Sequence, residues 1–186
     1  MSWLNQSPHL AGKAAQYAMT EDFRRVFLDD VDGLFQLSLL LTADPEKAEQ
    51  CFVAGLEESL ESNRVFRDWV RPWAKVAVIK NAIRAVQPRS WQPKSSSDRS
   101  SSPMRDTAAD DGSFDLGPLL ALPDFERFVF VMSVLETYSD HDCSLLLDCS
   151  LQDVRNARIR ALTQITQSVR KDSFAVTTMN IERDLL

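Results

Sequence analysis

Two helix starts, eleven residues apart, restrict what the second half of this chain can form. Ser139 precedes a short apolar segment, and Ser150 precedes another segment with Asp153 three residues on. A serine followed at that spacing by an acidic residue is typical of a helix N-terminus. We therefore predict, between Leu122 and Leu162, an amphipathic helix followed by two helices joined by a tight turn at Asp148 and Cys149. This is a helix-turn-helix arrangement, which DNA-binding proteins use.

The last of these helices carries charge of one sign. From Val154 through Lys171 there are five basic residues and no acidic one. A solvated helix face usually mixes signs, so this run favours a polyanionic partner. An ordinary helical hairpin with a basic surface is the alternative that composition leaves open. Base edges are reached from the start of such a helix, and we expect DNA contacts from Gln152, Arg155, Asn156, Arg158 and Arg160.

The rotation of this helix follows from its apolar positions. With Val154, Ala161 and Ile165 on the buried side, Arg158 is predicted near that side and Ile159 is predicted to face outward. Either the aliphatic part of the Arg158 side chain follows the edge of the core, or the helix is rotated from this orientation. In the preceding helix we expect Leu146 to be buried between the two helices.

Single residues across this segment also form a pattern: Leu122-Pro123, Arg127, Val129, Val131, Leu135-Glu136, Tyr138-Ser139, Leu145 to Leu147, Ser150 and Val154. The pattern resembles region four of the extracytoplasmic-function sigma factors, the bacterial specificity subunits of RNA polymerase. In that family the helix-turn-helix binds the upstream promoter element. Farther upstream, Leu34 to Leu39 and Leu41 to Glu49 resemble region two of the family, and Trp73 to Arg84 resembles the helix that follows it.

The resemblance implies two small helical domains joined by a flexible linker, the second containing the helix-turn-helix. No segment alternates with a period of two, so periodicity also predicts an all-α fold. Residues 87–117 contain eight serines and little apolar surface, which is typical of a linker. The predicted organisation is an N-terminal extension over 1–20, a region-two-like domain over 21–86, the linker over 87–117, a region-four-like domain over 118–170 and a C-terminal tail over 171–186.

Charge divides the first domain. Residues 21–61 contain eleven acidic and three basic residues, whereas residues 64–89 contain seven basic residues and one acidic residue. An acidic helical surface can dock on a protein, while a basic helix can follow phosphates. With the resemblance, this predicts nucleic-acid contact by Lys80, Asn81 and Arg84. It predicts polymerase contact by Asp44, Glu46, Glu49, Val53 and Ala54.

Aromatic residues are interleaved with the basic ones in this region. Phe66, Trp69 and Trp73 could hold bases flipped out of a duplex, because stacking must be replaced by equivalent contact. Large aromatics at helical spacing are more often buried, so we predict that both tryptophans pack in the helical core. In the helix that begins at Pro45, we predict that Phe52, Leu56 and Leu60 face the same core.

The chain also departs from the family. Where the family commonly has Gln-Glu in the polymerase-binding helix, this chain has Val53-Ala54, followed by Gly55; a frequent family aspartate is replaced near Ala85. The resemblance implies transcription initiation with core RNA polymerase and promoter DNA as partners, and an anti-sigma factor as a further candidate partner. The departures keep two alternatives open: a sigma-like protein-interaction module, acting as a decoy or an anti-sigma partner, and a stand-alone helix-turn-helix regulator.

Other classes of protein are disfavoured. There is no glycine-rich phosphate loop and no HExxH motif, so we expect neither an enzyme nor a cofactor. Three cysteines without a CxxC pair predict no disulfide framework. A metal cluster of Cys143 and Cys149 with His141 and Asp142 fits no familiar ligand spacing, so we assign no metal. Without an apolar run of membrane-spanning length or a signal-peptide layout, we expect a cytoplasmic protein with no membrane partner.

Overall fold

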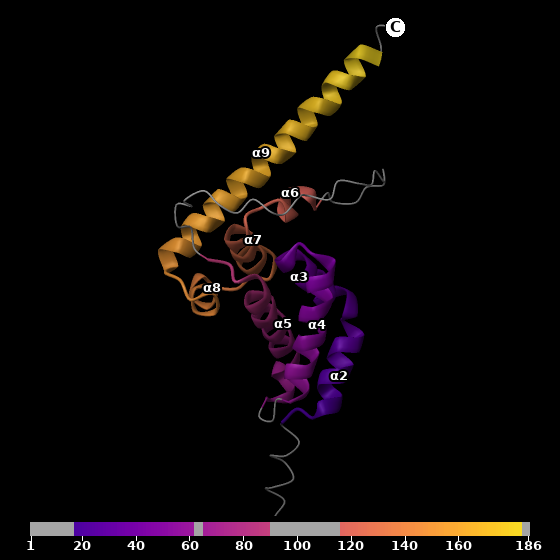
Figure 1. Cartoon of the computed structure of the whole chain (residues 1–186), viewed down its shortest axis with the longest axis vertical. Coiled ribbons are helices and arrows are strands. Elements are labelled where there is room, and N and C mark those ends of the chain that lie inside the picture. The colour runs from indigo at the N-terminus through magenta and orange to yellow at the C-terminus, as the bar shows by residue number, and fades with distance from the viewer. Residues whose placement is uncertain (1–16, 62–64, 90–115, 184–186) are drawn as a thin grey trace, which may run out of the picture. The chain divides into compact units, whose positions relative to one another are not determined.

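The computed structural model describes residues 17–61, 65–89 and 116–183, with side chains as far as Ser168 together with Arg170. The chain divides after Gln87 into two units. The described residues are helical, and their sole strand-like feature is an isolated bridge between Tyr17 and Phe66 (Figure 1). The predicted all-α fold is confirmed. Most of the predicted N-terminal extension and linker lies outside the described residues.

The first unit contains helices α2 (Thr20–Asp29), α3 (Val31–Thr42), α4 (Pro45–Leu60) and α5 (Val70–Val86), with a short 3-10 turn, η1 (Arg67–Trp69), before α5. The most extensive contact joins α4 to α5, and α3 packs on both (Figure 1). Aliphatic and aromatic side chains fill the core between them: Phe23, Phe27, Leu34, Leu37, Leu41, Val78 and Ile79.

The predicted start of α4 is confirmed. The Asp44 side chain accepts hydrogen bonds from the backbone N–H groups of Glu46 and Lys47 at 3.0 and 3.2 Å, and Pro45 occupies the first helical position. Proline fits there because the missing N–H has no intrahelical partner in any case. The preceding helix ends at Ala43, whose φ of 53° turns the chain into α4.

The buried face of α4 differs from the prediction. Small residues form it: Ala48, Cys51, Gly55 and Ser59. The predicted stripe of Phe52, Leu56 and Leu60 is only half-buried. A Cβ on Gly55 would lie 2.9 Å from Val78 Cγ2 and 3.2 Å from Val78 Cα, so glycine permits a close approach of α4 to α5. The predicted stripe contacts the core beside this face: the Phe52 ring lies edge-on to that of Phe27, with centroids 5.5 Å apart, and Leu60 packs against Phe23, Val65 and Val70.

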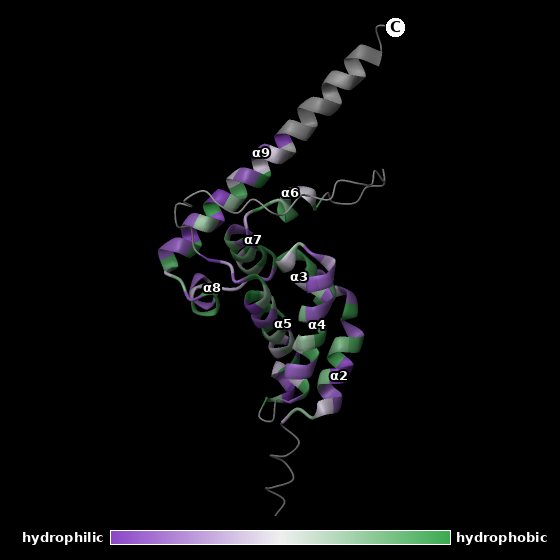
Figure 2. Ribbon diagram, in the orientation of Figure 1, coloured by the Kyte–Doolittle hydropathy of each residue, from purple (hydrophilic) through white to green (hydrophobic). Residues whose placement is uncertain are grey.

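The second unit contains a short α6 (Gly117–Leu120), α7 (Asp124–Phe130), a π-helical turn, η2 (Val131–Leu135), α8 (Asp140–Leu147) and α9 (Leu151–Arg183). Its core gathers under the first half of α9, which contacts α6, α7 and α8. Hydrophilic and hydrophobic residues alternate along this half (Figure 2). Apolar side chains buried in this core include Leu122, Phe125, Phe128, Val129, Val131, Met132 and Val154.

Helix α9 runs on into the predicted C-terminal tail, and the buried position of α8 differs from the prediction. Helix α9 continues to Arg183, beyond the predicted start of the tail at residue 171, because no glycine or proline ends the helix between these points. In α8, Leu147 is buried and Leu146 only half-buried, while Leu145 is 67% exposed. Within the described part of the chain, no helix combines the length and the apolar character that a membrane crossing requires.

Candidate nucleic-acid interface

Two capping boxes fix the geometry of α8 and α9. The Ser139 hydroxyl accepts a hydrogen bond from Asp142 N–H at 3.1 Å, and Ser139 N–H donates to the Asp142 carboxylate at 3.3 Å. Ser150 and Asp153 repeat the arrangement at 3.1 and 3.2 Å. Between them Asp148 adopts a φ of 50°, which ends α8. Both predicted helix starts and the tight turn are therefore present.

The start of α9 presents polar side chains to solvent. Gln152, Arg155 and Asn156 are exposed, and Gln152 Nε2 donates to Asn156 Oδ1 at 3.0 Å. The opposite side of the helix packs Val154, Ala157 and Ala161 into the core. The predicted rotation is confirmed, because Arg158 is half-buried and Ile159 is 63% exposed.

Acidic residues from the preceding helices hold the arginines of α9. Asp140 accepts from Arg155 Nε at 3.2 Å and from Arg158 Nη1 at 2.6 Å. Arg160 Nε donates to Glu126 Oε1 at 2.8 Å. The hydrogen bonds from Arg158 and Arg155 hold the pKa of the Asp140 carboxyl below its usual range. Sequence reasoning missed both acceptors, since nothing in the spacing from Asp140 to Arg158 identifies tertiary partners.

Helix α7 supplies further charged contacts to the first half of α9. Glu126, which binds Arg160, is 5% exposed, and the neighbouring Arg127 is 4% exposed. Arg127 donates from Nη1 to the Leu122 carbonyl at 2.8 Å and from Nη2 to Asp124 at 2.6 Å. A buried guanidinium needs such partners, because an unsatisfied buried charge is strongly destabilising. The start of α7 and the first half of α9 are thus tied by charged groups as well as by apolar packing.

In the first unit, both tryptophans lie on the surface, contrary to the prediction. Trp69 is 66% exposed, Trp73 is 38% exposed, and Phe66 beside them is 49% exposed. Trp69 belongs to the 3-10 turn before α5, outside the helical periodicity that predicted its burial. Trp73 lies beside the closely packed small residues of α5, where Ala74 and Ala77 take the buried positions.

One of these aromatics, Trp73, adjoins a predicted basic residue. Lys80 Nζ lies 5.7 Å from the centroid of the Trp73 ring, within range of a cation–π interaction. Phe66 stacks on Tyr17 with ring centroids 5.0 Å apart. Trp73, Lys80 and Arg84 follow at helical spacings of seven and four residues, which places them along one side of α5. We call Phe66, Trp69, Trp73, Lys80 and Arg84 the aromatic–basic face.

The other predicted contacts of α5 have an acidic partner. Arg84 Nη1 donates to Glu58 Oε2 at 2.7 Å, and Asn81 Nδ2 donates to the same oxygen at 3.1 Å. The hydrogen bond from Arg84 is the main cause of the lowered pKa of Glu58. Asn81 also donates to the Ala77 carbonyl at 2.9 Å. Arg84 remains mostly exposed, whereas Asn81 has its amide group engaged within the helix pair.

The predicted polymerase contacts on α4 fall into two groups. Asp44 serves as the helix cap, so its carboxylate is occupied by backbone N–H groups. Glu46 and Glu49 are exposed and share one side of the helix with Val53, which is 45% exposed; Ala54 is half-buried on another side. The result is an acidic helix face that carries one apolar side chain.

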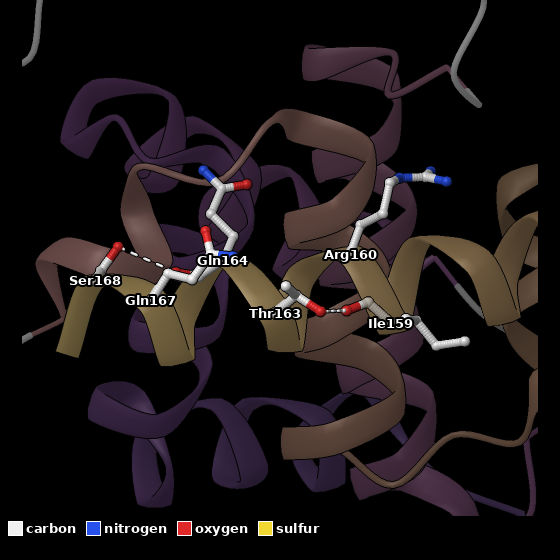
Figure 3. A pocket seen from close by; sticks show the side chains of 6 residues that line it. All are labelled: Ile159, Arg160, Thr163, Gln164, Gln167 and Ser168. Carbon is white, nitrogen blue, oxygen red and sulfur yellow. Dashed lines mark hydrogen bonds between the residues drawn. The ribbon is translucent and has the colours of Figure 1, made fainter. Parts of the chain in front are cut away.

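The second unit also contains a buried cysteine and a surface hollow. Burial raises the pKa of the Cys143 thiol to about 11, which favours the unreactive protonated form at neutral pH. Among the described residues, no group of three or more potential ligands could hold a metal ion. A hollow beside α9 is lined from this one helix by Ile159, Arg160, Thr163, Gln164, Gln167 and Ser168 (Figure 3).

Comparison with known proteins adds no relative: no family model matches the chain, and no curated protein matches it.

Proposed function

We propose that this chain is a sigma-factor-like transcription initiation protein that binds core RNA polymerase and promoter DNA. The observation that supports this most strongly is the exposed set of Gln152, Arg155 and Asn156 at the start of a capped helix that follows a tight turn. Such side chains suit hydrogen bonding to base edges in the major groove, where asparagine pairs with adenine and arginine with guanine.

The first unit supplies a complementary surface. The aromatic–basic face offers exposed rings beside cations, which is the chemistry that binds single-stranded nucleic acid. A promoter must be both recognised as duplex and opened, and the two units have surfaces suited to these two tasks. In this proposal the protein acts in the cytoplasm as a binding subunit, without catalytic residues or a cofactor of its own.

The initiation function is tested with core polymerase from the source organism and fragmented genomic DNA. Transcripts made with and without the full chain are sequenced from their 5′ ends. We expect start sites that depend on the chain and share an upstream sequence. Asn156→Ala should abolish or redirect them by losing ~1–3 kcal/mol of base discrimination. Gln167→Ala, which changes an exposed polar residue of the same helix three turns on, is the control. Absence of chain-dependent start sites would refute initiation.

Polymerase binding is tested separately on α4. Glu46→Lys together with Glu49→Lys should slow association with core polymerase more than it speeds dissociation, because exposed charges steer encounter. Glu21→Lys, also exposed but on α2, is the control for charge reversal. Equal effects of both changes would mean that α4 has no specific part in the contact.

A second candidate function follows from Val53. An exposed valine on an acidic helix face suits a protein partner that offers basic groups around an apolar pocket. If the chain leaves core polymerase unbound, the sigma-like interaction module replaces the initiation function. A chain that binds duplex DNA but not polymerase would be the stand-alone regulator.

A further inference from the structure

One carboxylate holds two arginines of α9 in different ways. Asp140 Oδ2 accepts from Arg155 Nε at 3.2 Å, whereas Arg158 approaches with both terminal nitrogens, Nη1 at 2.6 Å from Oδ1 and Nη2 at 3.5 Å from Oδ2. Arg155 has 55% of its side chain exposed and Arg158 has 32%. The two arginines therefore differ in what they can offer to a second partner.

A guanidinium recognises guanine or phosphate through a pair of parallel N–H donors. Asp140 takes only Nε of Arg155, so it orients this side chain and does not use its terminal amino groups. With Arg158, the carboxylate occupies the terminal pair itself. Arg155 therefore keeps its terminal pair of donors for a base edge, whereas Arg158 has its terminal pair engaged and is also the less exposed of the two side chains.

We propose that Asp140 is a positioning residue that sets the DNA specificity of α9, by fixing Arg155 for base contact and keeping Arg158 from binding phosphates. This inference rests on the proposed binding of DNA by α9. Phosphate contacts strengthen binding to every sequence alike, whereas base contacts discriminate. A carboxylate that withholds one arginine lowers sequence-independent binding and so raises the ratio of specific to non-specific affinity. It also places a negative charge near the DNA backbone, which repels phosphate.

The test uses the full chain and a short duplex of random sequence, titrated at several salt concentrations. Asp140→Asn should tighten binding ~1.4- to 5-fold, the range expected from releasing the one partly exposed ion pair that holds Arg158. One additional phosphate contact should steepen the slope of log affinity against log salt by about 0.9. Asp140→Glu keeps the charge and should return both quantities toward the wild-type values.

Two further variants separate positioning from a general charge effect. Asp148→Asn removes an acidic charge from the other end of α8, at a φ of 50° that asparagine tolerates well. It should tighten binding less than Asp140→Asn. Arg158→Gln should change duplex affinity little by itself, but it should cancel most of the gain in the Asp140→Asn background. A lysine at position 158 cannot make the two-pronged contact with the Asp140 carboxylate. Arg158→Lys should therefore steepen the salt slope of duplex binding while Asp140 is intact. This variant tests the inference even if Asp140→Asn fails to fold.

Specificity is measured by selecting bound sequences from a randomised duplex pool with the wild type and with Asp140→Asn. We expect weaker sequence preference in the variant. Each of three results would overturn the inference. The effects of Asp140→Asn and Arg158→Gln on duplex affinity could be additive, or Asp140→Asn and Asp148→Asn could change that affinity equally. The third is a salt slope in Arg158→Lys that equals that of the wild type. Absence of duplex binding by every variant would overturn it as well. These measurements contain no polymerase, so a failure of transcription initiation leaves their result readable.

Discussion

Replacing Gly55 by alanine tests the packing that brings α4 against α5. An alanine Cβ would lie 2.9 Å from Val78 Cγ2 and 3.2 Å from Val78 N and Cα. The valine side chain can turn, but the backbone of α5 must move. Overpacking of this kind costs about 1–3 kcal/mol, while alanine gains about 1 kcal/mol of helix propensity over glycine. We therefore expect Gly55→Ala to lower the free energy of unfolding by about 1 kcal/mol. This corresponds to a fall of ~4–8 °C in the melting temperature of a unit of this size.

Gly33 provides the matched control. It is exposed in α3, and its added Cβ would meet the Asp30 carboxylate, the mobile end of a side chain. Gly33→Ala should therefore be neutral or stabilising by up to ~1 kcal/mol. Both variants are compared with the wild type by calorimetric melting and by urea unfolding followed by circular dichroism. If Gly55→Ala raises the melting temperature as Gly33→Ala does, the close approach of α4 and α5 is wrong.

Three further results are expected. Trp73→Ala should cost less stability than the ~3–5 kcal/mol of a buried tryptophan, and it should weaken single-stranded DNA binding by ~1–3 kcal/mol. Phe35→Ala, on another helix, is the comparison. A large loss of stability without loss of binding in Trp73→Ala would contradict the surface role. Phe128→Ala should lower the free energy of unfolding by ~3–5 kcal/mol because the Phe128 ring is fully buried. Leu145 is 67% exposed, so Leu145→Ala should be close to neutral in the same urea titration. Comparable losses in the two variants would mean that α8 is rotated differently. Because Arg84 lowers the pKa of Glu58 below its ordinary value of 4.5, the carboxylate stabilises the fold above that pH and loses its effect as pH falls through the lower folded value. The unfolding free energies of wild type and Glu58→Gln should converge on acidification, and a constant difference would argue against the ion pair.

Much of the local structure could be predicted from the sequence because its causes are local. Ser139 and Ser150 begin helices through hydrogen bonds to residues three positions on, and Asp44 with Pro45 begins α4 in the same way. Periodicity placed Val154 and Ala161 in the core and turned Ile159 outward, which the structure confirms. The position of the start of α9, and the exposure of Gln152, Arg155 and Asn156 there, follow from these two signals.

The surroundings of the predicted site residues depend on contacts between segments that are distant in the sequence. Burial of Trp69 and Trp73 was predicted from their spacing, but Trp69 lies in a 3-10 turn outside that periodicity, and Ala74 and Ala77 take the buried positions of α5 next to Trp73. Likewise, Arg155 and Arg158 indicate a basic helix in the sequence, and only the packing of α8 beside α9 brings Asp140 to both. Capping and periodicity act within a few residues and can be predicted from the chain itself. The distance between two helices, and the partner of each surface charge, are set by how the elements pack and so were decided by the tertiary structure.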